Sequence, residues 1–185
     1  MSIINHFELH LGPIAQGWFA PRDERAIQVA KHANAPCESL CTYATLGLGH
    51  HLLAMPGGRE VRQELLMISD DTVADEVVIK LLSATSDALL SEHRAVLRGE
   101  VVGDATATPI APGSSCARLY AAIPAVFEES FQVYEESSPA TVIVWLIPIT
   151  LEESAFIRNC GWDCFESLLE KGQPDLFNWA RASVV

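Results

Sequence analysis

The sequence predicts a single mixed α/β (α+β) domain in which helices flank a central mixed β-sheet. Residues 141–153, TVIVWLIPITLEE, begin with a run of large and mostly β-branched apolar residues, which is typical of a strand buried on both faces. Thr150 and Glu153 have the spacing of a capping box, so this strand leads directly into a helix. Strand and helix patterns also alternate along the chain without a strict βαβ repeat, which favours a mixed sheet.

The first third of the chain is predicted to contain one helix and three strands. Apolar residues recur at helical spacing from Ile3 to Leu11, so residues 2–11 form a short amphipathic helix that docks on the sheet. The strand candidates are residues 14–19, 25–31 and 40–48, with a turn at 21–23 and a loop at 32–39. The loop from Gly49 to Gly58 is rich in glycine and is predicted to be irregular and exposed.

The middle of the chain is predicted to form a buried strand followed by the longest helix. Residues 60–68 end in the apolar sequence LLMI. Asp70 or Asp71 can cap a helix over residues 72–93, and His93 and Arg94 near its end favour the helix dipole. The apolar face of this helix is predicted to consist of Val73, Val77, Leu81, Thr85, Ala88 and Leu89.

The last part of the chain is predicted to add short strands and two helices. Small residues over 99–115 indicate extended chain and loops, and residues 118–122 and 130–134 are strand candidates. After the helix that begins at Thr150, Gly161 makes a break. Asp163 and Glu166 then have capping-box spacing for a final helix that ends at Gly172 as its C′ residue.

Composition indicates one folded domain over residues 1–185. No linker or change of composition divides the chain. Hydrophobic residues make up 49% of the sequence and charged residues 19%, which is sufficient for a real core. The longest apolar run is too short to span a bilayer, and no targeting segment is evident, so we expect a cytoplasmic protein without a membrane partner. The odd number of cysteines, five, fits a reducing compartment.

The charge of the chain predicts which partners it binds. With 24 Asp and Glu against 12 Lys and Arg, the formal net charge is −12, which disfavours nucleic acid and favours a basic protein. The acids often occur as neighbouring pairs. Such pairs are commonly only solvated surface, but several on one face would speed the encounter with a cationic protein. The residues predicted to contact a protein partner are Asp70, Asp71, Glu128, Glu129, Glu135 and Glu136.

The sequence assigns no catalytic, cofactor-binding or metal-binding residue. Gly47-Leu48-Gly49 lacks the third glycine of a dinucleotide fingerprint. His6 and His10 are four residues apart but lack the glutamate of the HExxH motif, so we expect two solvent-facing histidines. The pairs Cys37/Cys41 and Cys160/Cys164 lack the two-residue gap of structural zinc sites and are interpreted as buried free thiols. The last histidine precedes Ser114 and Ser115, which excludes the Ser, acid, His order.

Five sequence segments together resemble the Suppressor of fused domain family in its small bacterial form. They are HFELHLGP (6–13), TYATLGL (42–48), RQELLM (62–67), WLIPITLEE (145–153) and PDLFNWAR (174–181). The pair RQELLM and LIPIT is the most specific of these. The resemblance implies an α/β sandwich-like domain with a mixed sheet and no catalytic residue. It also implies that the chain corresponds to one lobe of the two-lobed animal adaptor.

Two functional hypotheses follow from the charge and the resemblance. Many bacterial members of the family are predicted immunity proteins, so the first hypothesis is a non-enzymatic module that binds and neutralises a basic toxin domain. The second is an uncharacterised enzyme or small-ligand-binding protein that uses the loop from Gly49 to Gly58, with His50 and His51. A polar pocket at that loop with shifted titratable groups would favour the second hypothesis.

Overall fold

The computed structural model describes residues 2–18, 27–103 and 107–185. The helices in these ranges are α1 (Ile3–Leu11), α2 (Asp75–Glu92), α3 (Leu151–Cys160) and α4 (Trp162–Gly172), with 3-10 turns η1 (Leu48–His50) and η2 (Glu129–Phe131). The strands are β1 (Ile14–Trp18), β2 (Gln28–Ala33), β3 (Leu40–Leu46), β4 (Leu53–Met55), β5 (Arg59–Asp70), β6 (Val101–Val102), β7 (Arg118–Ala122), β8 (Val133–Tyr134) and β9 (Thr141–Ile149). The turn predicted at residues 21–23 lies outside the described ranges. No described helix is long and apolar enough to cross a membrane.

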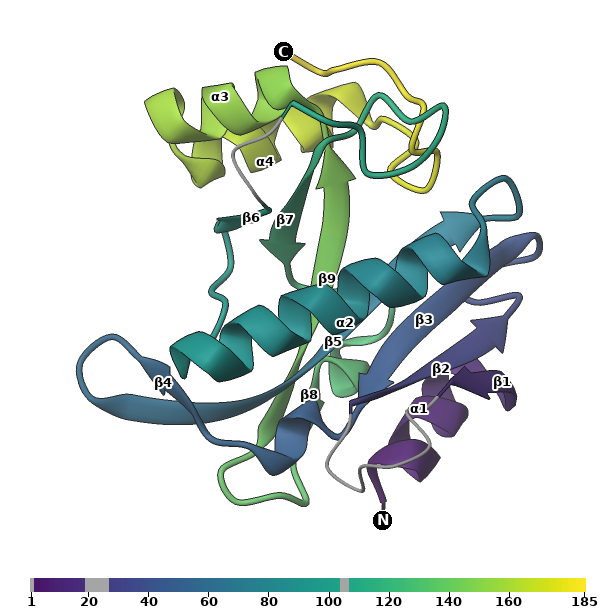
Figure 1. Cartoon of the computed structure of the whole chain (residues 1–185), viewed down its shortest axis with the longest axis vertical. Helices are drawn as coiled ribbons and strands as arrows, with labels where there is room; N and C mark the ends of the chain where they lie inside the picture. The colour runs from purple at the N-terminus through teal and green to yellow at the C-terminus, as the bar shows by residue number, and fades with distance from the viewer. Residues whose placement is uncertain (1, 19–26, 104–106) are drawn as a thin grey trace.

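The strands form one mixed sheet with β5 and β9 at its centre (Figure 1). The order is β1-β2-β3-β5-β9-β7-β6, and β4 and β8 pair with the N-terminal ends of β5 and β9. Among the described strands, β5 and β9 are the only parallel neighbours, with Arg62 opposite Thr141 and Leu66 opposite Trp145. The mixed sheet and the buried central strand over residues 141–149 are therefore confirmed.

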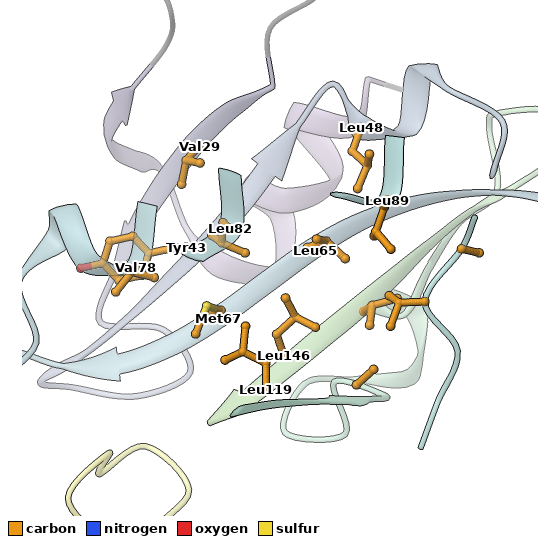
Figure 2. Packing of buried hydrophobic residues seen from close by; sticks show 14 of the residues in the cluster. Val29, Tyr43, Leu48, Leu65, Met67, Val78, Leu82, Leu89, Leu119 and Leu146 are labelled. Carbon is orange, nitrogen blue, oxygen red and sulfur yellow. The ribbon is translucent and has the colours of Figure 1, made fainter. Parts of the chain in front are cut away.

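Helices cover both faces of the central strands. On one face α2 crosses the sheet, and Figure 2 shows Leu82 and Leu89 of α2 near Leu65 and Leu146 of the strands. The alternate residues of β9 face the opposite way and pack with α1, η2, α3 and α4; they are Ile143, Trp145, Ile147 and Ile149. The period of two in a strand places neighbouring residues on opposite faces, so a run that is apolar at every position is covered twice.

Several predicted boundaries are wrong for local reasons. β2 continues through His32 and Ala33, which were assigned to a loop, because His32 pairs with Thr42 of β3 and its Nδ1 atom lies 2.7 Å from the carbonyl oxygen of Gly12. β3 stops at Leu46, since the next residue, a glycine, takes a φ of 115°. The predicted irregular loop at 49–58 contains β4, and the predicted strand at 130–134 divides into η2 and β8.

The start of α2 is not capped by Asp70 or Asp71, as the sequence predicted. The helix begins at Asp75, and its N-cap residue Ala74 makes no side-chain cap. Asp70 instead accepts a hydrogen bond of 3.0 Å from the backbone N–H of Thr72, which forms a local turn between β5 and the helix. The two aspartates therefore belong to the connection and not to the helix.

Asp75 attaches the first turn of α2 to the sheet. Its Oδ1 atom accepts hydrogen bonds from Lys31 Nζ at 2.8 Å and from Tyr43 Oη at 2.6 Å. Partial burial opposes ionisation, but these two donors lower the pKa of the Asp75 carboxyl group. The buried face of α2 is rotated by about one residue from the predicted face and consists of Val78, Leu82, Thr85, Ser86 and Leu89.

The helix α3 begins as the sequence predicted. Thr150 Oγ1 accepts from the backbone N–H of Glu153 at 3.2 Å, and Glu153 Oε2 accepts from the backbone N–H of Thr150 at 2.9 Å. Both Nη atoms of Arg181 also donate hydrogen bonds to the Glu153 carboxylate, at 2.6 and 2.8 Å. Both side chains of this pair are buried. The capping box thus also fixes the C-terminal segment of the chain.

The limits of α4 differ from the prediction. The helix begins immediately after Gly161 with no side-chain cap, so Asp163 and Glu166 do not form a capping box. Gly172 is still helical, and Gln173 takes the left-handed conformation that was predicted for Gly172. Glu166 instead accepts hydrogen bonds from Arg98 and Tyr120, which lie at the surface described below.

The C-terminal segment closes the sheet where β5 extends beyond its pairing with β9. The parallel register ends at Leu66, and the indole N–H of Trp179 donates to the carbonyl oxygen of Ile68 at 3.2 Å. The backbone N–H of Ser115 donates to the Trp179 carbonyl oxygen at 3.0 Å. The C-terminal segment thereby provides hydrogen-bond partners for backbone groups of β5 and of the chain before β7 that have no partner strand there.

Replacing Arg181 with Met tests the contribution of the buried pair. The substitution leaves the Glu153 carboxylate buried without its cation, so we expect the free energy of unfolding to fall by about 3–5 kcal/mol. Urea unfolding followed by circular dichroism measures this change. The matched control is Arg94→Met, which breaks ion pairs to Glu92 and Glu100 that are much more exposed and is expected to cost under about 1 kcal/mol. Equal losses in the two variants would contradict this role for Arg181.

Candidate protein-binding surface

The six acidic residues predicted to contact a partner lie at two separate places. Four of them surround η2 and β8 next to the N-terminal end of β9; they are Glu128, Glu129, Glu135 and Glu136. Asp70 and Asp71 lie at and just beyond the C-terminal end of β5. Tyr134 pairs with Thr141, which lies opposite Arg62, so the chain that leads to Glu135 and Glu136 is eight residues from Asp70 along the sheet, roughly 26 Å at about 3.3 Å per residue. Glu128 instead borders a groove that residues 33–36 also line, next to the start of β3, which pairs with Asp70. The acidic pairs therefore do not form one patch.

The segment that carries Glu128 and Glu129, residues 123–132, connects β7 to β8. Its anchor is Phe131, which is fully buried and whose carbonyl oxygen lies 3.0 Å from Nε2 of His6 on α1. His6 is buried, so the prediction of a solvent-facing histidine is wrong at this position. In contrast, Ile123 and Val126 are 39% and 40% exposed. The segment is thus fixed at one end and presents apolar side chains to solvent at the other.

Two grooves lie beside the 123–132 segment. The groove toward α4 has a volume of about 470 Å³, and its lining includes Trp145, Ile147, Ile123, Glu129, Leu169 and Glu170. The groove toward α1 has a volume of about 500 Å³, and its lining includes Leu9, His10, Val126, Phe127 and Glu128. The Leu9 side chain is 70% exposed. Apolar contact area with a charged rim is the usual composition of a protein-binding surface.

The electrostatic character of this surface is acidic. No Lys, Arg or His occurs between Arg118 and Arg158. Arg98 lines the groove toward α4, but its charge is already paired: Arg98 Nε donates a hydrogen bond to Glu166 Oε1 at 3.1 Å. Tyr120 Oη donates to the same oxygen at 2.9 Å, and burial together with this carboxylate raises the pKa of the tyrosine. The glutamates at positions 128, 129 and 170 are exposed on this surface.

Trp145 contributes an unsatisfied donor next to the first groove. Its side chain is buried and stacks on Phe177 with ring centroids 6.2 Å apart. The indole N–H has no hydrogen-bond acceptor among the residues that the structure describes. Buried polar groups of this kind normally have a partner.

The buried carboxyl group of Glu64 lies beneath the loop that follows β3. Glu64 Oε1 accepts from the backbone N–H groups of Gly47 and Gly49 at 2.9 and 3.0 Å, and Oε2 accepts from Thr45 Oγ1 at 2.5 Å. Thr45 Oγ1 also accepts the backbone N–H of Leu65, just beyond the end of the β3–β5 pairing. Burial raises the pKa of Glu64 from 4.5 to about 7, although the donated hydrogen bonds oppose this shift.

The Glu64 arrangement anchors a loop and does not form an open site. The Glu64 side chain is buried, and Arg62 Nη1 donates to the carbonyl oxygens of Gly49 and His50 at 2.9 Å each. Within the described residues, no three His, Cys, Asp or Glu side chains are close enough to hold a metal ion. The histidines of this loop, His50 and His51, therefore belong to no such group in the described part of the chain.

The cysteines are free, but most of them are not buried as the sequence predicted. Cys116 alone among the five is buried, and Cys41 is half-buried. Cys37, Cys160 and Cys164 are exposed. As the break at residue 161 predicted, the last two lie on different helices, because α3 ends where α4 begins.

Comparison with known proteins identifies the family. The family model of Suppressor of fused protein (SUFU) matches residues 23–182. The chain belongs to the Suppressor of fused family. Over 161 residues it is 23% identical to "Immunity protein YqcF" of Bacillus subtilis (strain 168), a match that covers 86% of this chain and 82% of that protein.

Two solved structures of the family show the same fold. A SUFU homologue from Neisseria gonorrhoeae FA 1090 superposes with a TM-score of 0.75 at 20% identity, covering 99% of this chain and 92% of that one. A chain of the Sufu–Fu complex superposes with a TM-score of 0.69 at 11% identity, covering 98% of this chain and 90% of that one. The resemblance drawn from sequence motifs is therefore confirmed.

Buried carboxylates explain why the family motifs in this chain are fixed relative to one another. Glu64 in RQELLM binds Thr45 and Gly47 in TYATLGL. Glu153 in WLIPITLEE binds Arg181 in PDLFNWAR. Four of the motifs that identify the Suppressor of fused family in the sequence are thus paired through the interior, whereas the 123–132 segment lies outside all five motifs.

Sequence reasoning missed most of this surface. It identified Glu128 and Glu129 from their charge, but Ile123, Val126 and Leu9 were not identified, because apolar residues are normally expected to be buried. Nothing in the local pattern distinguishes these exposed residues from buried ones. The proximity of α1 and α4 to the 123–132 segment depends on the order of strands, which local patterns do not specify.

Glu64→Gln tests whether the buried carboxyl group makes stability depend on pH. A pKa raised from 4.5 to about 7 means that the folded protein keeps a proton that the unfolded chain releases. The stabilising contribution is therefore complete below about pH 4.5 and is lost as the pH rises through about 7. We expect the difference in unfolding free energy, wild type minus variant, to fall by about 2–3 kcal/mol between about pH 5 and pH 7.5.

The control for this prediction is the same substitution at the exposed Glu60 of the same strand. Urea titrations of the wild type and of both variants at the two pH values give, for each of the three proteins, the change in unfolding free energy between these pH values. Glu60→Gln is expected to follow the wild type at both values. If Glu64→Gln also shows the wild-type pH dependence, the carboxyl group of Glu64 is ionised in the folded protein throughout this range.

Proposed function

We propose that this chain is a non-enzymatic immunity protein whose 123–132 segment binds a basic toxin domain and neutralises it. The observation that carries the proposal is the combination of exposed apolar side chains, Ile123 and Val126, with the exposed carboxylates Glu128 and Glu129 on one fixed segment. Apolar contacts supply affinity, and the carboxylates select a cationic partner and speed its encounter.

The relatives support a binding function. The Bacillus subtilis relative is an immunity protein, and another relative was solved as the Sufu–Fu complex. Both names describe action through another protein. The acidic net charge of −12 favours a basic partner, and toxin domains that attack nucleic acids are a class with this character. We place the interaction in the cytoplasm, where a toxin that acts on nucleic acids meets its target.

The two grooves indicate how such a toxin domain would be held. A lysine or arginine side chain that enters the groove toward α4 would lie over the apolar surface of Trp145 and Ile147 while its charge meets Glu129 and Glu170. A toxin so covered loses access to its substrate without any chemical change.

A second candidate function is a small-ligand or enzymatic role at the loop from Gly49 to Gly58. The observation in its favour is the pKa of about 7 for Glu64, which suits a general acid or base. Against it, the Glu64 oxygens are occupied by Thr45, Gly47 and Gly49, and the side chain is only 2% exposed. This role would require the loop to open.

Charge reversal on the segment tests the proposed function directly. With a basic toxin domain from a neighbouring gene as the binding partner, Glu128→Lys/Glu129→Lys is expected to lower the affinity by about 10–100-fold, mainly through slower association. Surface plasmon resonance at low and high salt measures both rates. Survival of cells that express the toxin with each variant measures neutralisation.

The matched control makes the same change of charge at the other end of the sheet. Asp71→Lys/Glu76→Lys also replaces two exposed acids with lysines and is expected to change the affinity by less than about threefold. Equal losses for both double variants would show that total charge, and not the 123–132 segment, determines binding. A neighbouring basic toxin that the wild-type chain neither binds nor neutralises would overturn the proposed function.

A further inference from the structure

A cavity of about 580 Å³ lies between α3 and the β6–β7 edge of the sheet, away from the 123–132 segment. Figure 1 shows α3 packed above this edge. The residues that line the cavity come from the segment around β6, from β7 and from α3. They are Gly99, Val101, Gly103, Arg118, Ser154, Ile157 and Arg158. The cavity thus contains two arginines and no acid among its lining residues, in a chain whose net charge is −12.

Arg118 occupies a position in β7 where an apolar residue would be expected. Leu119 packs beneath α2, so by strand alternation Arg118 and Tyr120 face the side covered by α3 and α4. Tyr120 meets a carboxylate there, because its hydroxyl group donates to Glu166. The α3 residues at the cavity beside Arg118 are Ser154, Ile157 and Arg158, none of which is acidic.

The guanidinium group of Arg118 opens on the cavity and has no counterion among the described residues. The residue as a whole is 8% exposed, and its one side-chain hydrogen bond within the described residues, of 2.6 Å, runs from Nη1 to the carbonyl oxygen of the adjacent Ala117. The other buried arginine, Arg181, is paired with Glu153. An anion in the cavity would pair with this cation, which is largely shielded from water and has no counterion among the described residues, and would thereby stabilise the fold.

Arg158 and Ser154 provide further donors to the same cavity. Arg158 Nη1 donates to Ser154 Oγ at 2.9 Å, which orients the guanidinium group along α3 and leaves its other N–H groups free of partners among the described residues. Gly103 allows the chain to pass close to Arg118, since a Cβ atom there would lie 3.1 Å from Arg118 Cδ. The donors of Arg118 and Arg158 therefore border one space.

We propose that this cavity binds a small oxyanion, a phosphate or carboxylate group, held between Arg118 and Arg158. Guanidinium groups are planar forks of N–H donors whose geometry matches the paired oxygens of both groups. The binding is independent of the proposed toxin surface, because no residue that lines this cavity also lines the two grooves beside the 123–132 segment. The stability added by the bound anion would rise with the logarithm of its concentration once the site is mostly occupied.

Thermal unfolding in matched salts tests this site. Sodium phosphate, sodium citrate and sodium chloride are compared at equal ionic strength and in the range of about 1–20 mM, where general salt effects on stability are small. The wild type is expected to unfold at a higher temperature in phosphate or citrate than in chloride. A response to phosphate alone assigns a phosphate ligand, and a response to citrate alone assigns a carboxylate ligand. Equal responses assign the oxyanion class that both share.

Arginine variants locate the effect. Arg118→Met and Arg158→Met are each expected to weaken the anion response at least about tenfold in concentration, and Arg94→Met, which removes an exposed and already paired arginine, is expected to leave it unchanged. Arg158 is exposed, so its variant keeps the test valid if Arg118→Met does not fold. An absent response in the wild type, or the same response in all three variants, overturns the proposal.

Discussion

The parallel pairing of β5 with β9 supports both faces of the sheet. Every residue of β9 except Val142 is buried, and the two strands present apolar side chains alternately to α2 and to the group of α1, η2, α3 and α4. Parallel strands buried on both faces require such double cover, because their pattern leaves no face for water. The surface at η2 and the cavity beneath α3 both depend on this pair, since each is built on elements that pack against it.

Three carboxylates, two of them buried and one partly buried, fix elements that the apolar core alone would hold loosely. Glu64 ties the loop after β3 to β5, Asp75 ties α2 to β2 and β3, and Glu153 ties the start of α3 to Arg181 near the C-terminus. Each contact joins residues that are distant in sequence, and each replaces water with defined donors. This arrangement accounts for the position of the family motifs: they are the places where a polar interior contact specifies one geometry. The acidic binding surface lies outside these contacts, where sequence is less constrained by the fold.

Local patterns predicted the parts of this structure that depend on local interactions. The capping box of Thr150 and Glu153 and the two-sided burial of residues 143–149 involve neighbours in the chain and were predicted correctly. The start of α2 was wrong because its acid, Asp75, is stabilised by residues 32 and 44 positions away. The six candidate acids stood out by their charge, but only strand order and register show that Asp70 and Asp71 are remote from Glu135 and Glu136. Exposure of Ile123 and burial of Arg118 contradict the usual preferences of their residue types, so composition did not indicate them.

The proposed interface is most directly tested by hydrogen–deuterium exchange of the chain alone and in complex with a basic toxin domain that it neutralises. Backbone amides that a partner covers exchange more slowly, and mass spectrometry of peptides locates them. The account predicts slower exchange over residues 123–132 and in α1, with unchanged exchange at Asp71 and the start of α2. Slower exchange at the start of α2, with none over residues 123–132, would contradict the account.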